Sequence, residues 1–161
     1  MNSLEFAIRM ELDGEKYYKE QAEINKDNEL STVFLNLAQD EENHAKIMQN
    51  MFNELTYELK DNNTLDQSKS VFKGIGDFEN KVWKLPRQID LYREALEREK
   101  ESIELYSKLL GLATDGHEKE CFEYLVNQEE DHFAILEELI LLASHPEEWV
   151  ESAEFGIRKG Y

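Results

Sequence analysis

The sequence has few of the residues that cross-link a chain or interrupt a helix. Among its 161 residues are one cysteine, two prolines and seven glycines. The single cysteine, Cys121, excludes an intrachain disulfide, a CxxC redox pair and any metal site built from several cysteines. Scarce proline and glycine favour long helices over strands. We therefore expect an all-α protein that resides in a reducing compartment, the cytoplasm.

Basic residues are also scarce. Eighteen lysines and arginines stand against 36 acidic residues, which leaves a formal charge of −18. Such a chain repels nucleic acid and anionic lipid and attracts cations. The longest apolar run, 139–143, is far too short to cross a bilayer, and the N-terminus shows no signal-peptide pattern. We expect neither nucleic acid nor a membrane among the partners.

Apolar residues recur at helical spacing in four stretches. The pattern predicts helices at about 3–24, 29–59 and 87–113, and a fourth that contains 121–143. The connector at about 60–87 is long enough to run back along a bundle, so that the second and third helices can run in parallel. This organisation predicts a four-helix bundle over 1–145, with a capping tail at 146–161 that begins a new helical segment at Pro146.

One pattern of carboxylate, phenol and imidazole side chains occurs twice, 88 positions apart. The first copy is Glu11, Tyr18, Glu41 and His44, and the second is Glu99, Tyr106, Glu129 and His132. Residues three apart share a helix face, so each Glu-x-x-His pair can approach one metal ion. Four carboxylates balance the charge of two divalent cations, while two neutral imidazoles fill further positions. The repeat predicts a dinuclear metal centre, with iron as the expected metal and manganese or zinc as alternatives.

An alternative without metal is a set of buried salt bridges. Burying one unpaired carboxylate costs several kcal/mol, and four together cost far more without compensating cations. The metal centre is therefore favoured. Tyr18 and Tyr106 lie two turns after Glu11 and Glu99. These two tyrosines could act in catalysis by holding ligands or moving an electron, or they could be ordinary core residues.

Five segments carry a resemblance to the ferritin-like diiron carboxylate proteins, most closely the rubrerythrin family. They are MELDGEKYY (10–18), DEENHAKIM (40–48), EREKESIELY (97–106), QEEDHFAIL (128–136) and EWVESAEFG (148–156). The resemblance covers nearly the whole chain. It implies a left-handed ferritin-like four-helix bundle whose diiron centre reacts with hydrogen peroxide or dioxygen. Together with the spacing, it implies Glu41 and Glu129 as bridging carboxylates and the other four metal-binding residues as terminal ligands.

Two departures from the family pattern bear on function. The sequence has one cysteine, too few for a four-cysteine rubredoxin domain, so we expect an external donor such as a rubredoxin-like protein to supply electrons. Ser102 stands where well-studied rubrerythrins carry an extra glutamate. We expect an oxidoreductase that reduces peroxide or dioxygen. The alternatives are a ferroxidase that stores iron, and a bundle whose metal is structural. A homodimer is expected, and the long connector would allow two chains to exchange hairpins.

Overall fold

The computed structural model describes residues 2–75 and 85–154, with side chains for 2–74 and 88–144. The described residues form five helices and no strand, which confirms the all-α prediction. The helices are α1 (Ser3–Ile24), α2 (Leu30–Phe52), α3 (Thr64–Ile75), α4 (Leu85–Leu112) and α5 (Gly116–Glu154). No helix in the described ranges is long and apolar enough to span a membrane.

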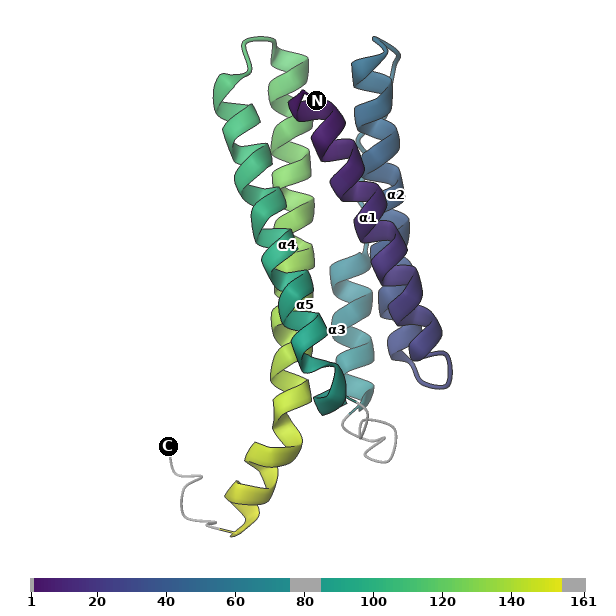
Figure 1. Ribbon diagram of the computed structural model, residues 1–161, viewed down its shortest axis with the longest axis vertical. Helices are drawn as coiled ribbons and strands as arrows, with labels where there is room; N and C mark the ends of the chain where they lie inside the picture. The colour runs from purple at the N-terminus through teal and green to yellow at the C-terminus, as the bar shows by residue number, and fades with distance from the viewer. Residues whose placement is uncertain (1, 76–84, 155–161) are drawn as a thin grey trace.

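The helices are arranged as two antiparallel hairpins, α1 with α2 and α4 with α5 (Figure 1). The segment between the hairpins returns along the bundle, so α2 and α4 run in the same direction, as expected. Part of this long connection forms α3, which packs against both α2 and α5. The fold is the helical bundle with a long second connection that the periodicity and spacing predicted, and it agrees with the ferritin-like bundle that the family resemblance implied.

Asparagines close the short turn between α1 and α2. The backbone N–H of Asn25 donates to the Gln21 carbonyl at 3.1 Å and continues the hydrogen bonding of α1 by one residue. The side chain of Asn28 accepts from the backbone N–H of Leu30 at 2.8 Å, at the start of α2. Asparagine is favoured at such helix ends because its short side chain replaces a missing backbone partner. The turn therefore fixes the register of the first hairpin.

Helix α2 ends at Phe52, seven residues before the predicted end at Leu59. Glu54 has a φ of 57°, and the N–H of Leu55 donates back to the carbonyl of Asn50 at 2.7 Å. A second bond, from the Glu54 N–H to the Met51 carbonyl, completes the Schellman arrangement that terminates helices. The predicted helix end was wrong because apolar residues continue at helical spacing as far as Leu55. The Leu55 side chain is 58% exposed, so it does not belong to the buried face of α2.

Replacing Glu54 with glycine is expected to stabilise the protein by about 0.5–1 kcal/mol. A positive φ costs a residue with a Cβ roughly 1–2 kcal/mol, and glycine removes this cost but increases the freedom of the unfolded chain. Urea denaturation measures the gain. Glu54→Ala keeps the Cβ and is the control, so an equal gain from alanine would show that the left-handed conformation is not the cause.

Helix α5 continues to Glu154 and passes through Pro146 without a break. The expectation of a new segment starting at Pro146 was therefore wrong. Proline lacks an N–H and crowds the carbonyl four residues earlier, which bends a helix without always ending it. The last turns of α5 indeed turn away from the bundle (Figure 1). The capping role of 146–161 stays a prediction, because the side chains of this tail lie outside the described set.

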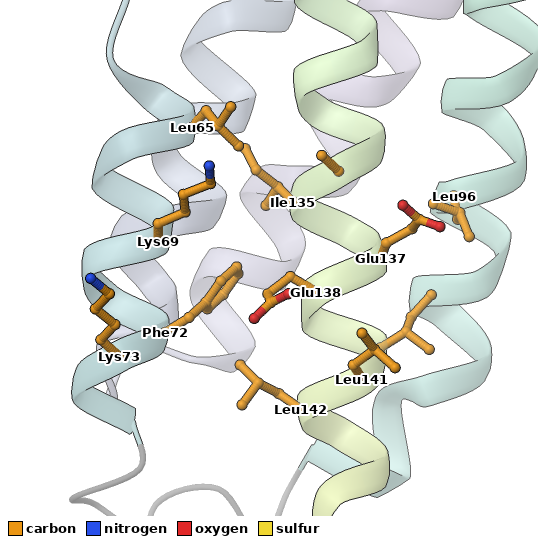
Figure 2. Close-up of a pocket in the computed structure, with 12 residues that line it drawn as sticks. Leu65, Lys69, Phe72, Lys73, Leu96, Ile135, Glu137, Glu138, Leu141 and Leu142 are labelled. Carbon is orange, nitrogen blue, oxygen red and sulfur yellow. The ribbon is translucent and has the colours of Figure 1, made fainter. Parts of the chain in front are cut away.

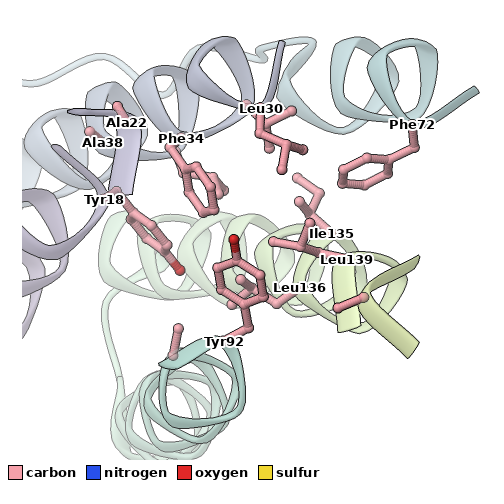
Figure 3. Packing of buried hydrophobic residues seen from close by; sticks show 14 residues of the cluster. Tyr18, Ala22, Leu30, Phe34, Ala38, Phe72, Tyr92, Ile135, Leu136 and Leu139 are labelled. Atoms are coloured by element: carbon pink, nitrogen blue, oxygen red, sulfur yellow. The ribbon is translucent and has the colours of Figure 1, made fainter. Parts of the chain in front are cut away.

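Among the residues whose side chains are described, the core consists of two apolar clusters. The first surrounds Tyr18, Phe34 and Tyr92, whose rings lie close together between the hairpins (Figure 3). The second contains Met48 and Leu125 among other buried residues. On each of the four long helices, residues of one cluster precede the predicted metal ligands in sequence and residues of the other cluster follow them. The predicted ligands therefore lie between two apolar layers that exclude water.

Candidate metal centre

The structure brings all six predicted metal-binding residues together in the middle of the bundle. They form two overlapping groups, Glu11, Glu41, His44 and Glu129 in one, and Glu41, Glu99, Glu129 and His132 in the other. Every member is buried, and within each group the ligand atoms lie within 4.8 Å of one another. Glu41 and Glu129 belong to both groups. This is the arrangement expected when two carboxylates bridge two cations.

Each imidazole is directed at the hairpin opposite its own. The Nδ1 atom of His44, on α2, lies 3.0 Å from Glu129 Oε1, on α5. The Nδ1 atom of His132, on α5, lies 2.8 Å from Glu41 Oε1, on α2. The two half-sites thus face each other across the interface between the hairpins. Neither hairpin contains a complete group by itself.

The hydrogen bonds of Tyr18 and Tyr106 also connect one hairpin to the other. Tyr18 on α1 donates its hydroxyl to Glu99 Oε1 on α4, and Tyr106 on α4 donates to Glu11 Oε1 on α1, both at 2.6 Å. Burial raises the pKa of both phenols well above the ordinary value, and the neighbouring carboxylates reinforce the effect. The hydroxyls therefore stay protonated and hold the two carboxylates in place as hydrogen-bond donors. A catalytic role for them stays a prediction.

The cluster holds protons unevenly. Burial raises the pKa of Glu41 well above the ordinary value, and the charges of Glu11 and Glu99 add to the effect. The pKa of Glu129 is raised for the same reasons. Burial also opposes ionisation of Glu11, but the charge of His44 and hydrogen bonds with Glu41, His44 and Glu129 together outweigh it and lower the pKa to about 2. The two shared carboxylates cannot both ionise among so many negative charges without a cation.

His132 and Glu99 form a complementary pair in the other half of the cluster. Burial alone would lower the pKa of His132, but the charge of Glu99 and the bond to Asp40 raise it well above the ordinary value. Burial likewise opposes ionisation of Glu99, and contacts with Glu129 and His132 nevertheless lower its pKa. Protons held by Glu41, Glu129 and His132 therefore offset part of the negative charge that bound cations would otherwise offset.

Two carboxylate oxygens support the fit of a metal to this site. Glu99 Oε2 and Glu129 Oε2 are fully buried, yet neither has a hydrogen-bond partner among the described residues. An unsatisfied buried acceptor costs roughly 1–3 kcal/mol, and more when it is charged. A divalent cation would satisfy both atoms. Oxygen and imidazole donors in this number suit iron, manganese or zinc.

Hollows lined by described residues border the cluster on two sides. A cavity of about 90 Å³ between α1 and α4 is lined by Gly14, Tyr18, Glu41, Glu99 and Ser102, among others. On another side, a groove of about 410 Å³ reaches the ring of His44 and includes residues of the connector. The smaller cavity therefore opens directly on two carboxylates of the cluster.

A larger hollow of about 910 Å³ lies elsewhere, between α3 and α5 (Figure 2). Its lining is mainly apolar and includes Phe72, Ile135 and Leu142, with charged side chains such as Lys69 at the margin. No member of either ligand group lines it. Size alone therefore does not identify the site, whereas the donor set does.

Sequence reasoning missed the residues that contact the outer edges of the imidazoles. His132 Nε2 lies 2.9 Å from Asp40 Oδ2, and His44 Nε2 lies 3.0 Å from Gln128 Oε1. The repeat could have revealed them, because positions 40 and 128 are also 88 apart and each precedes a predicted bridging glutamate. Gly14 was missed as well. Its closeness to Glu41 depends on how α1 packs against α2.

A helical bundle that buries four carboxylates and two histidines between two hairpins defines a ferritin-like protein with a carboxylate–histidine cluster able to hold metal. The family model described as Rubrerythrin matches residues 2–140, a range that contains all six cluster residues. The chain belongs to the rubrerythrin family, whose members are diiron carboxylate proteins. Searches of curated proteins and of solved structures found no match.

Proposed function

We propose that the protein holds two iron ions in the cluster and reduces hydrogen peroxide or dioxygen with electrons from an external donor. The observation that carries the proposal is the sharing of Glu41 and Glu129 between two buried ligand groups. A single structural metal would need only one such group. Two adjacent groups with common carboxylates suit a pair of cations that act together.

The roles of the residues follow from their positions. Glu41 and Glu129 would bridge the ions, Glu11 with His44 would complete one half-site, and Glu99 with His132 would complete the other. When bound, the two ferrous ions would supply one electron each to the oxidant. Tyr18 and Tyr106 hold the terminal carboxylates by hydrogen bonds whose donor and acceptor oxygens are 2.6 Å apart, and each phenol keeps a proton beside its carboxylate.

The small cavity beside Glu41 and Glu99 favours a small oxidant. Its volume of about 90 Å³ accommodates molecules of a few atoms, such as hydrogen peroxide or dioxygen, and is too small for most organic substrates. Ser102 contributes a hydroxyl to its wall, where well-studied members of the family carry a further carboxylate. Reduction of peroxide to two waters consumes two electrons and two protons, so each turnover requires a donor to restore the ferrous pair.

Turnover with a reductant tests this proposal. The protein would be loaded anaerobically with Fe(II), and peroxide consumption would be followed with a rubredoxin-type donor or a chemical reductant. We expect many peroxide molecules to be consumed per diiron site. Iron accumulation in a closed shell of many subunits, detected by size exclusion, would favour storage instead. A loaded protein that consumes no peroxide or dioxygen would contradict the proposal and favour a structural metal.

Replacing Gly14 with alanine is expected to weaken the centre while stabilising the helix. The added Cβ would lie 3.0 Å from Glu41 Oε2, so the carboxylate must move by a few tenths of an ångström. We expect roughly a tenfold loss in metal affinity or turnover, since displaced reacting groups cost large factors. Alanine should also raise the free energy of unfolding of the chelator-treated protein by about 1 kcal/mol.

Gly111→Ala is the matched control for that substitution. Gly111 lies in α4, and a Cβ added there meets nothing within 4 Å. The control should give the helix-propensity gain with unchanged metal affinity. Titration with Mn(II) and urea denaturation measure the two effects. Equal metal affinity in the two variants would show that the contact between Gly14 and Glu41 does not shape the site.

A further inference from the structure

The two histidines differ in what holds their outer nitrogen. Although the site repeats at 88 positions, Asp40 accepts from His132 at 2.9 Å, whereas its counterpart, Gln128, accepts from His44 at 3.0 Å. All four side chains are buried. One imidazole is therefore paired with a carboxylate and the other with a neutral amide. This is the clearest difference in charge between two otherwise equivalent half-sites.

The connector fixes the orientation of the amide. Asn62 donates its side-chain N–H to Gln128 Oε1 at 2.7 Å, and Asn62 Oδ1 in turn accepts from the backbone N–H of Thr64 at 3.1 Å. Gln128 therefore presents its oxygen, not its nitrogen, to His44. The Nε2 atom of His44 must carry a hydrogen, which leaves Nδ1 directed at the cluster. The same tautomer follows for His132 from its carboxylate partner.

We propose that Asp40 and Gln128 are positioning residues that make the two half-sites unequal, so that the half-site of His132 and Glu99 fills first and holds its cation more tightly. A carboxylate that accepts the outer N–H makes the imidazole a stronger electron donor to a metal than a neutral amide does. Removing such a partner typically weakens metal binding 10- to 100-fold. The inference rests on the proposed metal centre and concerns its order of loading.

Isosteric substitutions change the charge of each partner and keep its shape. Asp40→Asn leaves an acceptor oxygen but removes the charge, and Gln128→Glu adds a charge in the place of the amide. We expect Asp40→Asn to weaken the tighter step of cation binding roughly 10- to 100-fold, and Gln128→Glu to tighten the weaker step. The double variant should reverse the order of loading. A gain of affinity in Gln128→Glu is not explained by a merely structural role.

Calorimetric titration of the full chain with Mn(II) or Co(II) measures the dissociation constants of both cation-binding steps. Repulsion between the two cations makes the second binding step weaker than the first in every variant. The proposal is therefore tested by how the two dissociation constants change from one variant to the next. One equivalent of ⁵⁷Fe(II) then identifies the half-site, because Mössbauer spectra separate irons in different surroundings. The wild type should show one main doublet, and the double variant a different one that matches the doublet of the chain with His132 changed to Ala.

The outcomes separate this inference from the proposed function. A wild-type chain that binds no divalent cation would overturn the metal centre itself. The wild-type chain could instead bind two cations while both single variants keep its dissociation constants within about twofold. That result would support the metal centre but would overturn the proposed difference between the two half-sites. If Asp40→Asn fails to fold, Gln128→Glu decides alone, since unchanged or weaker binding in that variant contradicts the proposed role of the charge.

Discussion

Replacing Glu41 with alanine is expected to abolish binding of both metal ions, whereas His44→Ala should weaken only one. Glu41 belongs to both buried ligand groups, and His44 belongs to one. We expect the loss in Glu41→Ala to exceed roughly 100-fold in affinity for each ion, which corresponds to about 2.7 kcal/mol per site. Metal analysis after loading gives the stoichiometry, and calorimetric titration gives the constants.

Glu42→Ala is the matched control for Glu41→Ala. Glu42 is the next residue on α2, belongs to neither ligand group, and pairs with Lys46 at 3.1 Å near the surface. A surface pair of this kind contributes little to stability. The control should bind two ions with wild-type affinity. Small and equal effects of Glu41→Ala and His44→Ala would contradict the bridging role.

Removing the metal with a chelator is expected to destabilise the protein strongly at pH 8 and weakly at pH 5. Folding raises the pKa of Glu41, Glu129 and His132. The folded chain therefore binds protons more firmly than the unfolded chain at these groups. Their contribution to stability is complete below the unfolded values, near 4.5 and 6.5, and is lost as pH rises toward the folded values.

The opposite sign applies to the terminal carboxylates. Folding lowers the pKa of Glu11 to about 2 and also lowers that of Glu99. Their contribution is present above 4.5 and is lost as pH falls through the lowered values. The chelator-treated protein should therefore be most stable near about pH 5 and lose stability toward pH 8.

Bound cations replace the protons of the cluster, so the loaded protein should not lose stability in the same way. At free metal concentrations of 100 to 1,000 times the dissociation constant, binding adds about 2.7–4.1 kcal/mol to the free energy of unfolding. Urea denaturation at pH 5, 6.5 and 8, with and without metal, measures the difference. The double variant Glu41→Gln and Glu129→Gln should flatten the profile of the chelator-treated protein. A wild-type profile that rises steadily from pH 5 to 8 without metal would contradict this account.

The repeat and the helical periodicity were enough to predict the bundle and the six residues of the cluster. The periodicity is a local signal, because residues three or seven apart on a helix share a face whatever surrounds it, and the repeat requires only a comparison of the sequence with itself. The family match over residues 2–140 confirms the family and the fold that the motifs indicated. The ligand roles, the native metal and the external donor stay predictions.

Features that depend on backbone conformation or on distant contacts were not predictable in this way. The apolar stripe of α2 continues past Met51, but the left-handed conformation of Glu54 ends the helix, and a glutamate gives no sign of it. Tyr18 follows Glu11 on the same helix, yet it donates to Glu99 of the other hairpin. Only the docking of the two hairpins decides such pairings. The bond from Asn62 to Gln128 likewise requires the path of the connector.

Anomalous scattering from crystals of protein never exposed to a chelator tests the central claim most directly. Data collected on either side of the iron absorption edge locate each metal and identify it. The account predicts two iron peaks within the cluster, both beside Glu41 and Glu129, one nearer His44 and the other nearer His132. An absence of anomalous density among the six residues would contradict it.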